Sequence, residues 1–339
     1  PAELTPAPAS SGDVLTLPSG SADATLGALG FRDGALAADG TPLFLSGQVV
    51  TGAASAVVDG QDARAFVLAM AGDVEAAEGV ANAVMPGGAG ASMAPFLRRL
   101  ATLDAAAADF NHDRPRCHGY DRRPIAYAAK CVYGRPGATP TMALWGDSMA
   151  VELAAGLAPS VTAAGGALRL ISYSSCPPAA ELAFRDRPGC LRHDREMLAQ
   201  LTASPTVRTV ILVAQYRRYL GRFGPRFLAD FAAVATALAR AGKQVVVVYP
   251  IPSPPGPVPS LLARRAMRGG APTEVAIPRA AYDAESQAIV AALDRLTAQP
   301  GVIAVRPADR LCDATRCALS ADGRVLYWDD RHLSVAGAT

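Results

Sequence analysis

The sequence predicts an α/β fold in three layers: a mostly parallel five-stranded sheet flanked by helices, preceded by a small β-rich module. From about residue 140 onward, short apolar runs alternate with longer segments whose apolar residues recur at helical spacing. Strands separated by helices of this length pair in parallel through right-handed crossovers, and helices then cover both faces of the sheet. Nearer the start of the chain, Asp-Gly pairs separate the apolar runs and favour hairpins.

Composition divides the 339 residues into three parts. Residues 1–22 are rich in Pro, Ala, Ser and Gly and are predicted to be a linker. Residues 23–95 form the predicted β-rich module, with turns at three Asp-Gly pairs: Asp33-Gly34, Asp39-Gly40 and Asp59-Gly60. Residues 96–339 form the predicted α/β domain, which opens with a helix over about 94–108 and is large enough to bury a core.

Five apolar runs predict the strands of the sheet: 141–146, 168–173, 207–213, 244–249 and 302–305. Segments with helical spacing lie between them, after residue 148 and at 191–202, 227–240 and 279–297. A glycine follows the third of these helices, which is a common stop signal, and a Pro-rich loop is expected over 250–259.

Charge and hydropathy exclude two classes of protein. The 32 cations are interspersed with 30 anions and form no basic run, so we expect no nucleic-acid surface. The strongly apolar run at 245–248 is far shorter than the roughly 18 residues that a membrane span requires. Because the chain begins at Pro1 instead of Met, we expect that a targeting or membrane segment has been removed.

A Gly-Asp-Ser stands where the first strand of the sheet changes into a helix. Ser148 is therefore expected at the carboxyl edge of the sheet, with helix N–H groups pointing at whatever approaches its hydroxyl. That place suits a nucleophile, although an isolated Asp-Ser turn is more often a helix N-cap. Asp147 is interpreted as a turn-former, and Ser148 needs a base to remove its proton.

The best candidate for the base is His332, which follows the last predicted strand. A carboxylate three residues earlier, Asp329, can hold one ring nitrogen while the other faces Ser148, which completes a triad. Asp330 competes for that orienting role. The alternative for His332 is a hydrogen-bonded core histidine.

The remaining histidines lie among polar and charged neighbours, and each is expected to be a solvated surface residue: His112, His118 and His193. His112 also follows a carboxylate by three residues, but it precedes the strand of the serine in a polar stretch. No grouping suggests a metal site, and no cofactor is expected.

Three motifs carry a resemblance to a known family: Leu-Trp-Gly-Asp-Ser ending at Ser148, Ser-Cys-Pro-Pro at 175–178, and Asp-Asp-Arg-His-Leu-Ser at 329–334. The chain resembles the SGNH (GDSL-like) esterase and acyltransferase superfamily over about residues 100–339. It is most similar to the extracytoplasmic SGNH domains fused to acyltransferase type-3 membrane proteins, which O-acetylate bacterial surface polysaccharides. The family's Asp-x-x-His spacing favours Asp329 over Asp330.

The expected oxyanion hole departs from the superfamily pattern, which uses a glycine and an asparagine. Ser174 and Ser175 follow the second strand where the glycine would stand, and Gln215 follows the third strand in place of the asparagine. Backbone N–H groups of Ser148 and of Ser174 or Ser175 can serve, as can the Gln215 amide. Met149 replaces a histidine that is common in the fused branch.

An arginine-rich stretch after the third strand is the candidate substrate surface. The default expectation for this stretch is a solvated face of a helix or loop. The alternative is a substrate surface, on which Arg217 contacts acidic sugars or a membrane partner and Tyr216 and Tyr219 stack on a sugar ring.

Six cysteines fall into three close pairs: Cys117 with Cys131, Cys176 with Cys190, and Cys312 with Cys317. Fifteen pairings are formally open, but neighbours in sequence are the simplest choice, and none has zinc-type spacing. The sequence thus predicts three local disulfides and an oxidising compartment. Six reduced thiols in a cytosolic enzyme are the alternative.

The leading hypothesis is an O-acyltransferase domain, with acetyl as the expected group. It acts on a bacterial surface polysaccharide such as lipopolysaccharide, in the periplasm, through an acyl-serine. The resemblance implies an acyl donor supplied by an upstream membrane acyltransferase domain, with tethering to the inner membrane. A carbohydrate acetyl esterase and a non-catalytic glycan-binding module are the alternatives.

Overall fold

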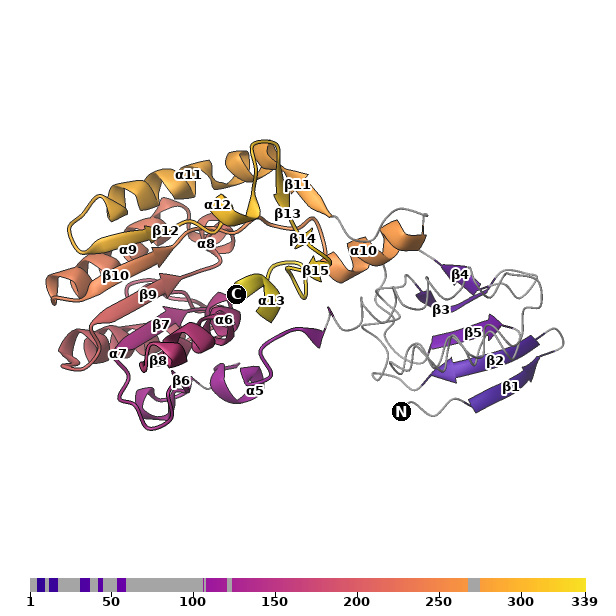
Figure 1. Cartoon of the computed structure of the whole chain (residues 1–339), viewed down its shortest axis with the longest axis horizontal. Coiled ribbons are helices and arrows are strands. Elements are labelled where there is room, and N and C mark those ends of the chain that lie inside the picture. Colours follow the sequence, from indigo (N-terminus) through magenta and orange to yellow (C-terminus); the bar gives the residue numbers. More distant parts are fainter. Residues whose placement is uncertain are drawn as a thin grey trace. The chain divides into compact units, whose positions relative to one another are not determined.

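The computed structural model describes the backbone of five strands within residues 5–58, together with residues 106, 108–120, 124–267 and 275–339. The chain forms two compact units (Figure 1). The first comprises Pro1–Asp109, Pro254–Val275 and Ser320–Arg331, and the second comprises Phe110–Ser253, Ala276–Leu319 and His332–Thr339.

The first unit contains small antiparallel sheets. Its strands are β1 (Thr5–Ala9), β2 (Gly12–Leu17), β3 (Phe31–Leu36), β4 (Pro42–Phe44), β5 (Ala54–Val58), β14 (Ser320–Ala321) and β15 (Arg324–Val325). They pair in the order β1-β2-β5, with β3-β4 and β14-β15 as separate pairs. Helix α10 (Val258–Met267) follows the Pro-rich stretch and begins inside the loop predicted for 250–259.

The predictions for the first hundred residues have mixed outcomes. Asp39-Gly40 falls between the antiparallel strands β3 and β4, as a hairpin requires. Asp33-Gly34 lies inside β3, so the turn predicted there is wrong. Strands β1 and β2 lie within the predicted linker 1–22. The helix predicted for 94–108 falls almost entirely outside the described residues.

The second unit is built on a six-stranded sheet in the order β12-β10-β9-β7-β8-β6 (Figure 1). Five strands are parallel and match the predicted ones: β7 (Met142–Gly146), β8 (Ala167–Ser172), β9 (Thr209–Val213), β10 (Gln244–Val248) and β12 (Val302–Val305). The sixth, β6 (Val132–Gly134), pairs antiparallel with β8. The sequence did not predict it because three residues are too few to show a pattern.

Helices cover both faces of this sheet, as predicted. They are α5 (Arg114–Cys117), α6 (Met149–Ala163), α7 (Cys190–Ala203), α8 (Tyr216–Phe223), α9 (Pro225–Arg240), α11 (Arg279–Thr297), α12 (Ala308–Leu311) and α13 (Val335–Ala338). A 3-10 turn, η1 (Tyr127–Ala129), and the strand pair β11 (Ala276–Pro278) and β13 (Arg316–Ala318) complete the unit. Among the described residues, no helix is long and apolar enough to cross a membrane.

Strand β7 shows why its sequence is apolar without interruption. Consecutive side chains of a strand point to opposite faces. Trp145 accordingly packs with side chains of α7, α8, α9 and α11. Leu144 instead packs on the other face with side chains of α6. A strand buried on both faces has no polar positions, and the abrupt Gly-Asp-Ser therefore marks the point where the chain leaves the sheet.

Covalent and steric contacts fix the ends of these elements. The three predicted disulfides, Cys117–Cys131, Cys176–Cys190 and Cys312–Cys317, are all present. Helix α13 packs on α6 at Gly156, where a Cβ atom would lie 2.3 Å from the carbonyl oxygen of Ala338. Only glycine allows that approach, which holds the segment after His332 against the helix that follows Ser148.

Candidate active site

Ser148 lies at the junction of β7 and α6. Its hydroxyl makes no capping hydrogen bond to the helix; Oγ lies 2.8 Å from Nε2 of His332. Gly146 makes the close packing of this junction possible, because a Cβ atom there would lie 2.5 Å from the carbonyl oxygen of Val213 on β9. The structure thus brings together two predicted site residues that are 184 positions apart in the sequence.

His332 is buried, with 8% of its surface exposed, and lies just before α13. When the ring carries its proton on Nδ1, Nε2 accepts the hydroxyl proton of Ser148. Ser148 itself is half-buried at the N-terminus of a 15-residue helix, whose dipole stabilises negative charge. A hydroxyl, a base and a positive helix end therefore meet at one point.

The two candidate carboxylates differ in their partners. Both oxygens of Asp330 receive hydrogen bonds from the guanidinium of Arg331, each at 2.6 Å. Asp329 accepts the backbone N–H of Arg331 at Oδ1 over 2.8 Å, and its carbonyl oxygen accepts the N–H of Val258 over 3.2 Å. Asp330 is thus committed to a local ion pair, whereas Asp329 shapes the turn that leads to His332.

Asp147 holds the turn between β7 and α6, which carries Ser148, through hydrogen bonds of its buried carboxylate. It is 1% exposed, and its Oδ1 accepts the N–H of Met149 over 3.0 Å. Its Oδ2 accepts the N–H of Gln215 over 3.0 Å and the hydroxyl of Tyr219 over 2.7 Å. Asp147 therefore forms the turn, as the sequence predicts, and also ties it to the end of β9 and to helix α8.

A second set of hydrogen bonds holds the backbone of the same turn. Ser172, at the end of β8, donates its hydroxyl to the carbonyl oxygen of Asp147 over 2.9 Å, and His118 Nδ1 lies 2.7 Å from that hydroxyl. Because the single hydroxyl proton goes to the carbonyl, Nδ1 must donate and His118 carries its proton there. Within the described residues His118 Nε2 is buried without a hydrogen-bond partner.

The environment of His118 keeps it neutral. Burial, together with the positive charge of Arg114, lowers the pKa of His118 to about 3. His118 and His193 are 2% and 3% exposed, so the prediction that they are solvated is wrong, while His112 is exposed as expected. No local pattern indicates this burial, since polar neighbours surround both histidines in the sequence.

An ion pair holds the first turn of α6. Arg114 Nη2 and Nε bind Oε1 of buried Glu152 at 2.6 Å and 3.0 Å, and the N–H of Asn111 donates to Oε2 over 2.6 Å. Arg114 Nη2 also lies 3.4 Å from the carbonyl oxygen of Ser148. No local sequence pattern indicates this pair, because its two residues lie on separate helices.

Two predicted oxyanion serines behave differently. The N–H of Ser174 donates to the carbonyl oxygen of Gly119 over 2.8 Å, so it is already used and that prediction is corrected. Ser175 adopts a left-handed conformation with φ of 55°. Within the described part of the chain, no acceptor takes the N–H of Ser175 or that of Ser148. Gln215 is half-buried at the N-cap of α8, and Asp147 uses its backbone N–H.

The predicted sugar-stacking tyrosines lie in the core. Tyr216 and Tyr219 are 2% and 1% exposed, and the hydroxyl of Tyr216 donates to the carbonyl oxygen of Val248 over 2.8 Å. Neither ring can stack on a ligand, so that prediction is wrong. Their spacing of three residues on one face of a helix was the available signal. Arg217 is exposed and pairs with Glu285 at 2.7 Å.

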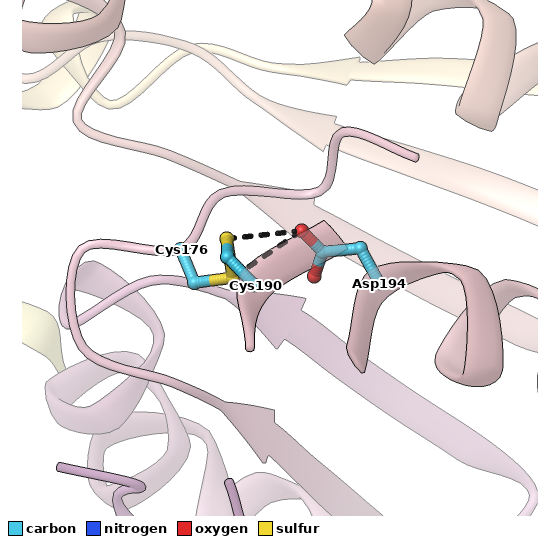
Figure 2. A group of neighbouring side chains, drawn as sticks. All are labelled: Cys176, Cys190 and Asp194. Carbon is cyan, nitrogen blue, oxygen red and sulfur yellow. Dashed lines mark hydrogen bonds between the residues drawn. A yellow bond between two sulfur atoms is a disulfide. The ribbon is translucent and has the colours of Figure 1, made fainter. Parts of the chain in front are cut away.

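Cys176, Cys190 and Asp194 bring three potential ligand atoms within 4.8 Å of one another (Figure 2). The two sulfurs are bonded to each other, which removes the thiolates that a metal would need. Burial raises the pKa of Asp194 well above its usual value. Its Oδ2 lies 3.3 Å and 3.4 Å from the two sulfurs of the disulfide.

Residues 116–339 match the family described as the SGNH domain (fused to AT3 domains). The periplasmic domain of the lipopolysaccharide acetyltransferase of Salmonella ser. Paratyphi A has a similar fold, with a TM-score of 0.51 and 12% identity. The similarity covers 69% of this chain and 95% of that domain, and at this identity it shows the fold alone. No curated protein matches the chain. Since the match spans well over half of its residues, the chain belongs to the family of SGNH domains that are fused to AT3 domains.

Proposed function

We propose that this chain is an O-acyltransferase domain that passes an acyl group, preferably acetyl, from Ser148 to a hydroxyl of a bacterial surface polysaccharide. The observation that supports it most is the 2.8 Å contact between Ser148 Oγ and His332 Nε2 at the N-terminus of α6. That distance is within hydrogen-bonding range for a nucleophile and its base.

In the first half-reaction Ser148 Oγ attacks the acyl carbonyl and His332 takes the hydroxyl proton. The C–O bond to the donor then breaks, and the imidazolium returns the proton to the leaving oxygen. In the second half-reaction a sugar hydroxyl gives its proton to His332 and attacks the acyl-serine. The ester moves to the sugar and the proton returns to Ser148.

Asp329 is the proposed orienting carboxylate. It stands three residues before His332, the spacing that the family uses, and Asp330 is bound through both oxygens to Arg331. A carboxylate on Nδ1 would fix the ring tautomer and stabilise the imidazolium.

The N–H groups of Ser148 and Ser175 are the proposed oxyanion donors. The positive φ of Ser175 is a conformation that favours glycine, and the superfamily places its glycine at the corresponding strand end. Gln215 is the proposed substitute for the asparagine. If the asparagine's hydrogen bond to the oxyanion is not replaced, the loss costs about 3–4 kcal/mol of transition-state stabilisation. Hydrolysis is then slow, which suits an enzyme that must not lose its acyl group to water.

We place the domain in the periplasm, next to a membrane module that supplies the acyl donor and tethers it to the inner membrane. Three disulfides favour an oxidising compartment. Membership of a family fused to AT3 domains supports the membrane partner. The similar Salmonella domain, which is periplasmic, supports the location.

Incubation with p-nitrophenyl acetate, with and without a sugar acceptor, tests the proposal. We expect Ser148 to become acetylated and the acetyl group to reach the sugar, and we expect Ser148→Ala to do neither. Release of acetate alone would indicate the alternative esterase. A folded protein in which Ser148 is never acetylated would indicate a glycan-binding module.

A further inference from the structure

Tyr120 is the exposed aromatic side chain that the described part of the chain presents at the catalytic edge of the sheet. Four large apolar side chains are exposed among the described residues: Tyr120 at 41%, Val132 at 46%, Ile303 at 43% and Val305 at 44%. Ile303 and Val305 lie on β12, the outermost strand on one side of the sheet, and Val132 lies on β6, the outermost strand on the other side. Tyr120 alone combines an aromatic face with a place near the nucleophile.

The backbone before Tyr120 extends the sheet. The N–H of Gly119 donates to the carbonyl oxygen of Ser172 over 3.2 Å, and the N–H of Ser174 donates to that of Gly119 over 2.8 Å. The backbone groups of every second residue in a strand point to the same side. The N–H of Leu170 donates to Cys131, just before β6, so the carbonyl of Ser172 and the N–H of Ser174 also point to the side of β8 where β6 lies.

The other side of β8 carries β7, which ends at the nucleophile turn. Gly146 of β7 pairs with Ser172 of β8. Gly119 therefore lies two strand spacings from the line of β7, about 10 Å, at the same carboxyl end.

The ring of His118 supports the ring of Tyr120. Its ring meets that of His118 edge to face, with centroids 4.6 Å apart and an interplanar angle of 86°. His118 is itself fixed to Ser172, and the Cys117–Cys131 disulfide fixes the residue before it. Because His118 is held rigidly, the ring of Tyr120 does not have to rearrange when its exposed face contacts a ligand.

We propose that Tyr120 binds a pyranose ring of the polysaccharide acceptor, one sugar residue away from the hydroxyl that attacks acyl-Ser148. The inference rests on the proposed function and names the residue that recognises its acceptor. The C–H bonds on one face of a pyranose carry partial positive charge, which the negative face of an aromatic ring attracts. Tyrosine offers that face at a small cost in conformational entropy.

The distance selects the neighbouring sugar. A hydroxyl that attacks at Ser148 must lie at the end of β7, so the sugar that carries it is too far from Tyr120 to stack on it. The next ring of the glycan extends past the end of β8 towards Tyr120. Other tyrosines that follow strands at this edge are buried in the core and cannot replace it: Tyr173, Tyr216, Tyr219 and Tyr249.

The test applies Ser148→Ala protein to an array of bacterial polysaccharides and oligosaccharides. This variant cannot form the acyl-serine, so it can bind an acceptor without modifying it. We expect it to bind at least one of these glycans. Adding Tyr120→Ala should weaken binding to that glycan about tenfold, as for other truncated aromatic anchors. Tyr120→Leu, which keeps an apolar contact with His118 but has no ring, should weaken it equally. Tyr120→Phe should bind normally, and so should the matched control Ile303→Ala.

Two results would overturn the inference. One is that Tyr120→Ala and Tyr120→Leu bind like the parent protein; the other is that the parent binds no glycan on the array. Acetylation of Ser148 by p-nitrophenyl acetate is measured separately on the wild-type protein. If Ser148 is never acetylated, the proposed function fails whatever the array shows.

Discussion

The hydroxyl of Tyr219 donates a 2.7 Å hydrogen bond to Oδ2 of Asp147 and so joins helix α8 to the turn that presents Ser148. A hydrogen bond to a buried charged group contributes about 1.5–3 kcal/mol. The turn that carries Ser148, the proposed nucleophile, is thus held from outside its own strand and helix, and displacement of a reacting atom by about 1 Å can reduce a rate a hundredfold.

Tyr219→Phe should therefore lower both the free energy of unfolding and kcat. We expect a loss of about 1.5–3 kcal/mol in urea unfolding and a fall in kcat of about tenfold or more. Tyr216→Phe is the matched control, because its equally buried hydroxyl donates to Val248 instead of the turn. It should lose stability with little change in kcat. Equal kcat values for the two variants would contradict a positioning role for Tyr219.

Substitutions at His118 test the second support of the turn. His118→Asn places an amide N–H near the position of Nδ1 and should keep the hydrogen bond to Ser172. His118→Gln places its amide nearer Nε2 and should lose that bond. We expect kcat to fall about tenfold in the glutamine variant, with KM unchanged, and to recover largely in the asparagine variant. Ser172→Ala should behave like His118→Gln, and equal activity of all three variants would refute the link.

Buried histidines should make the protein sensitive to acid. Burial, with the charges of Lys130 and Arg192, lowers the pKa of His193 to about 3, from 6.5 in an unfolded chain. Between pH 6.5 and 3 the unfolded state holds the extra proton, so the free energy of unfolding falls as the pH falls. The slope is about 1.4 kcal/mol per pH unit for each such histidine.

Chemical denaturation between pH 7 and 4 measures this slope. His193→Gln, which cannot take up a proton, should show a shallower dependence on pH than the wild type. The exposed His112→Gln should show the wild-type slope. If His193→Gln also retained the full slope, other groups would have to account for the acid sensitivity.

Gly156→Ala should loosen the segment that follows His332. The new Cβ atom would lie 2.3 Å from the carbonyl oxygen of Ala338, so α13 must move away from α6, at about 1–3 kcal/mol. Gly221→Ala is the control, since nothing lies within 4 Å of a Cβ atom there on helix α8, and it should stabilise the protein slightly. Thermal unfolding of both variants gives the comparison, and an unchanged Tm for Gly156→Ala would show that the two helices separate freely.

Particular residues show where sequence reasoning succeeds. The meeting of Ser148 and His332 could be predicted because few residue types can serve as a nucleophile and its base, and because the end of a buried strand is visible as an abrupt change from apolar to polar. The parallel strands were predicted for the same reason: burial on both faces leaves no polar position in the run. The disulfides followed from the spacing of the six cysteines.

Other residues could not be placed because their environment arises from distant parts of the chain. His118 is buried by the end of β8, more than fifty positions away, and nothing in its polar neighbourhood indicates this. Tyr216 and Tyr219 follow a strand, where a binding loop is common, but a short helix turns both rings into the core. Arg114 and Glu152 meet only after α5 and α6 are packed.

The acylation of Ser148 tests the central claim most directly. After a brief reaction with p-nitrophenyl acetate and acid quenching, peptide mass spectrometry should locate one acetyl group on Ser148. His332→Gln, without the base, should acquire it about a thousandfold more slowly. An acetyl group on another residue, or acylation of Ser148 at the same rate without His332, would contradict the account.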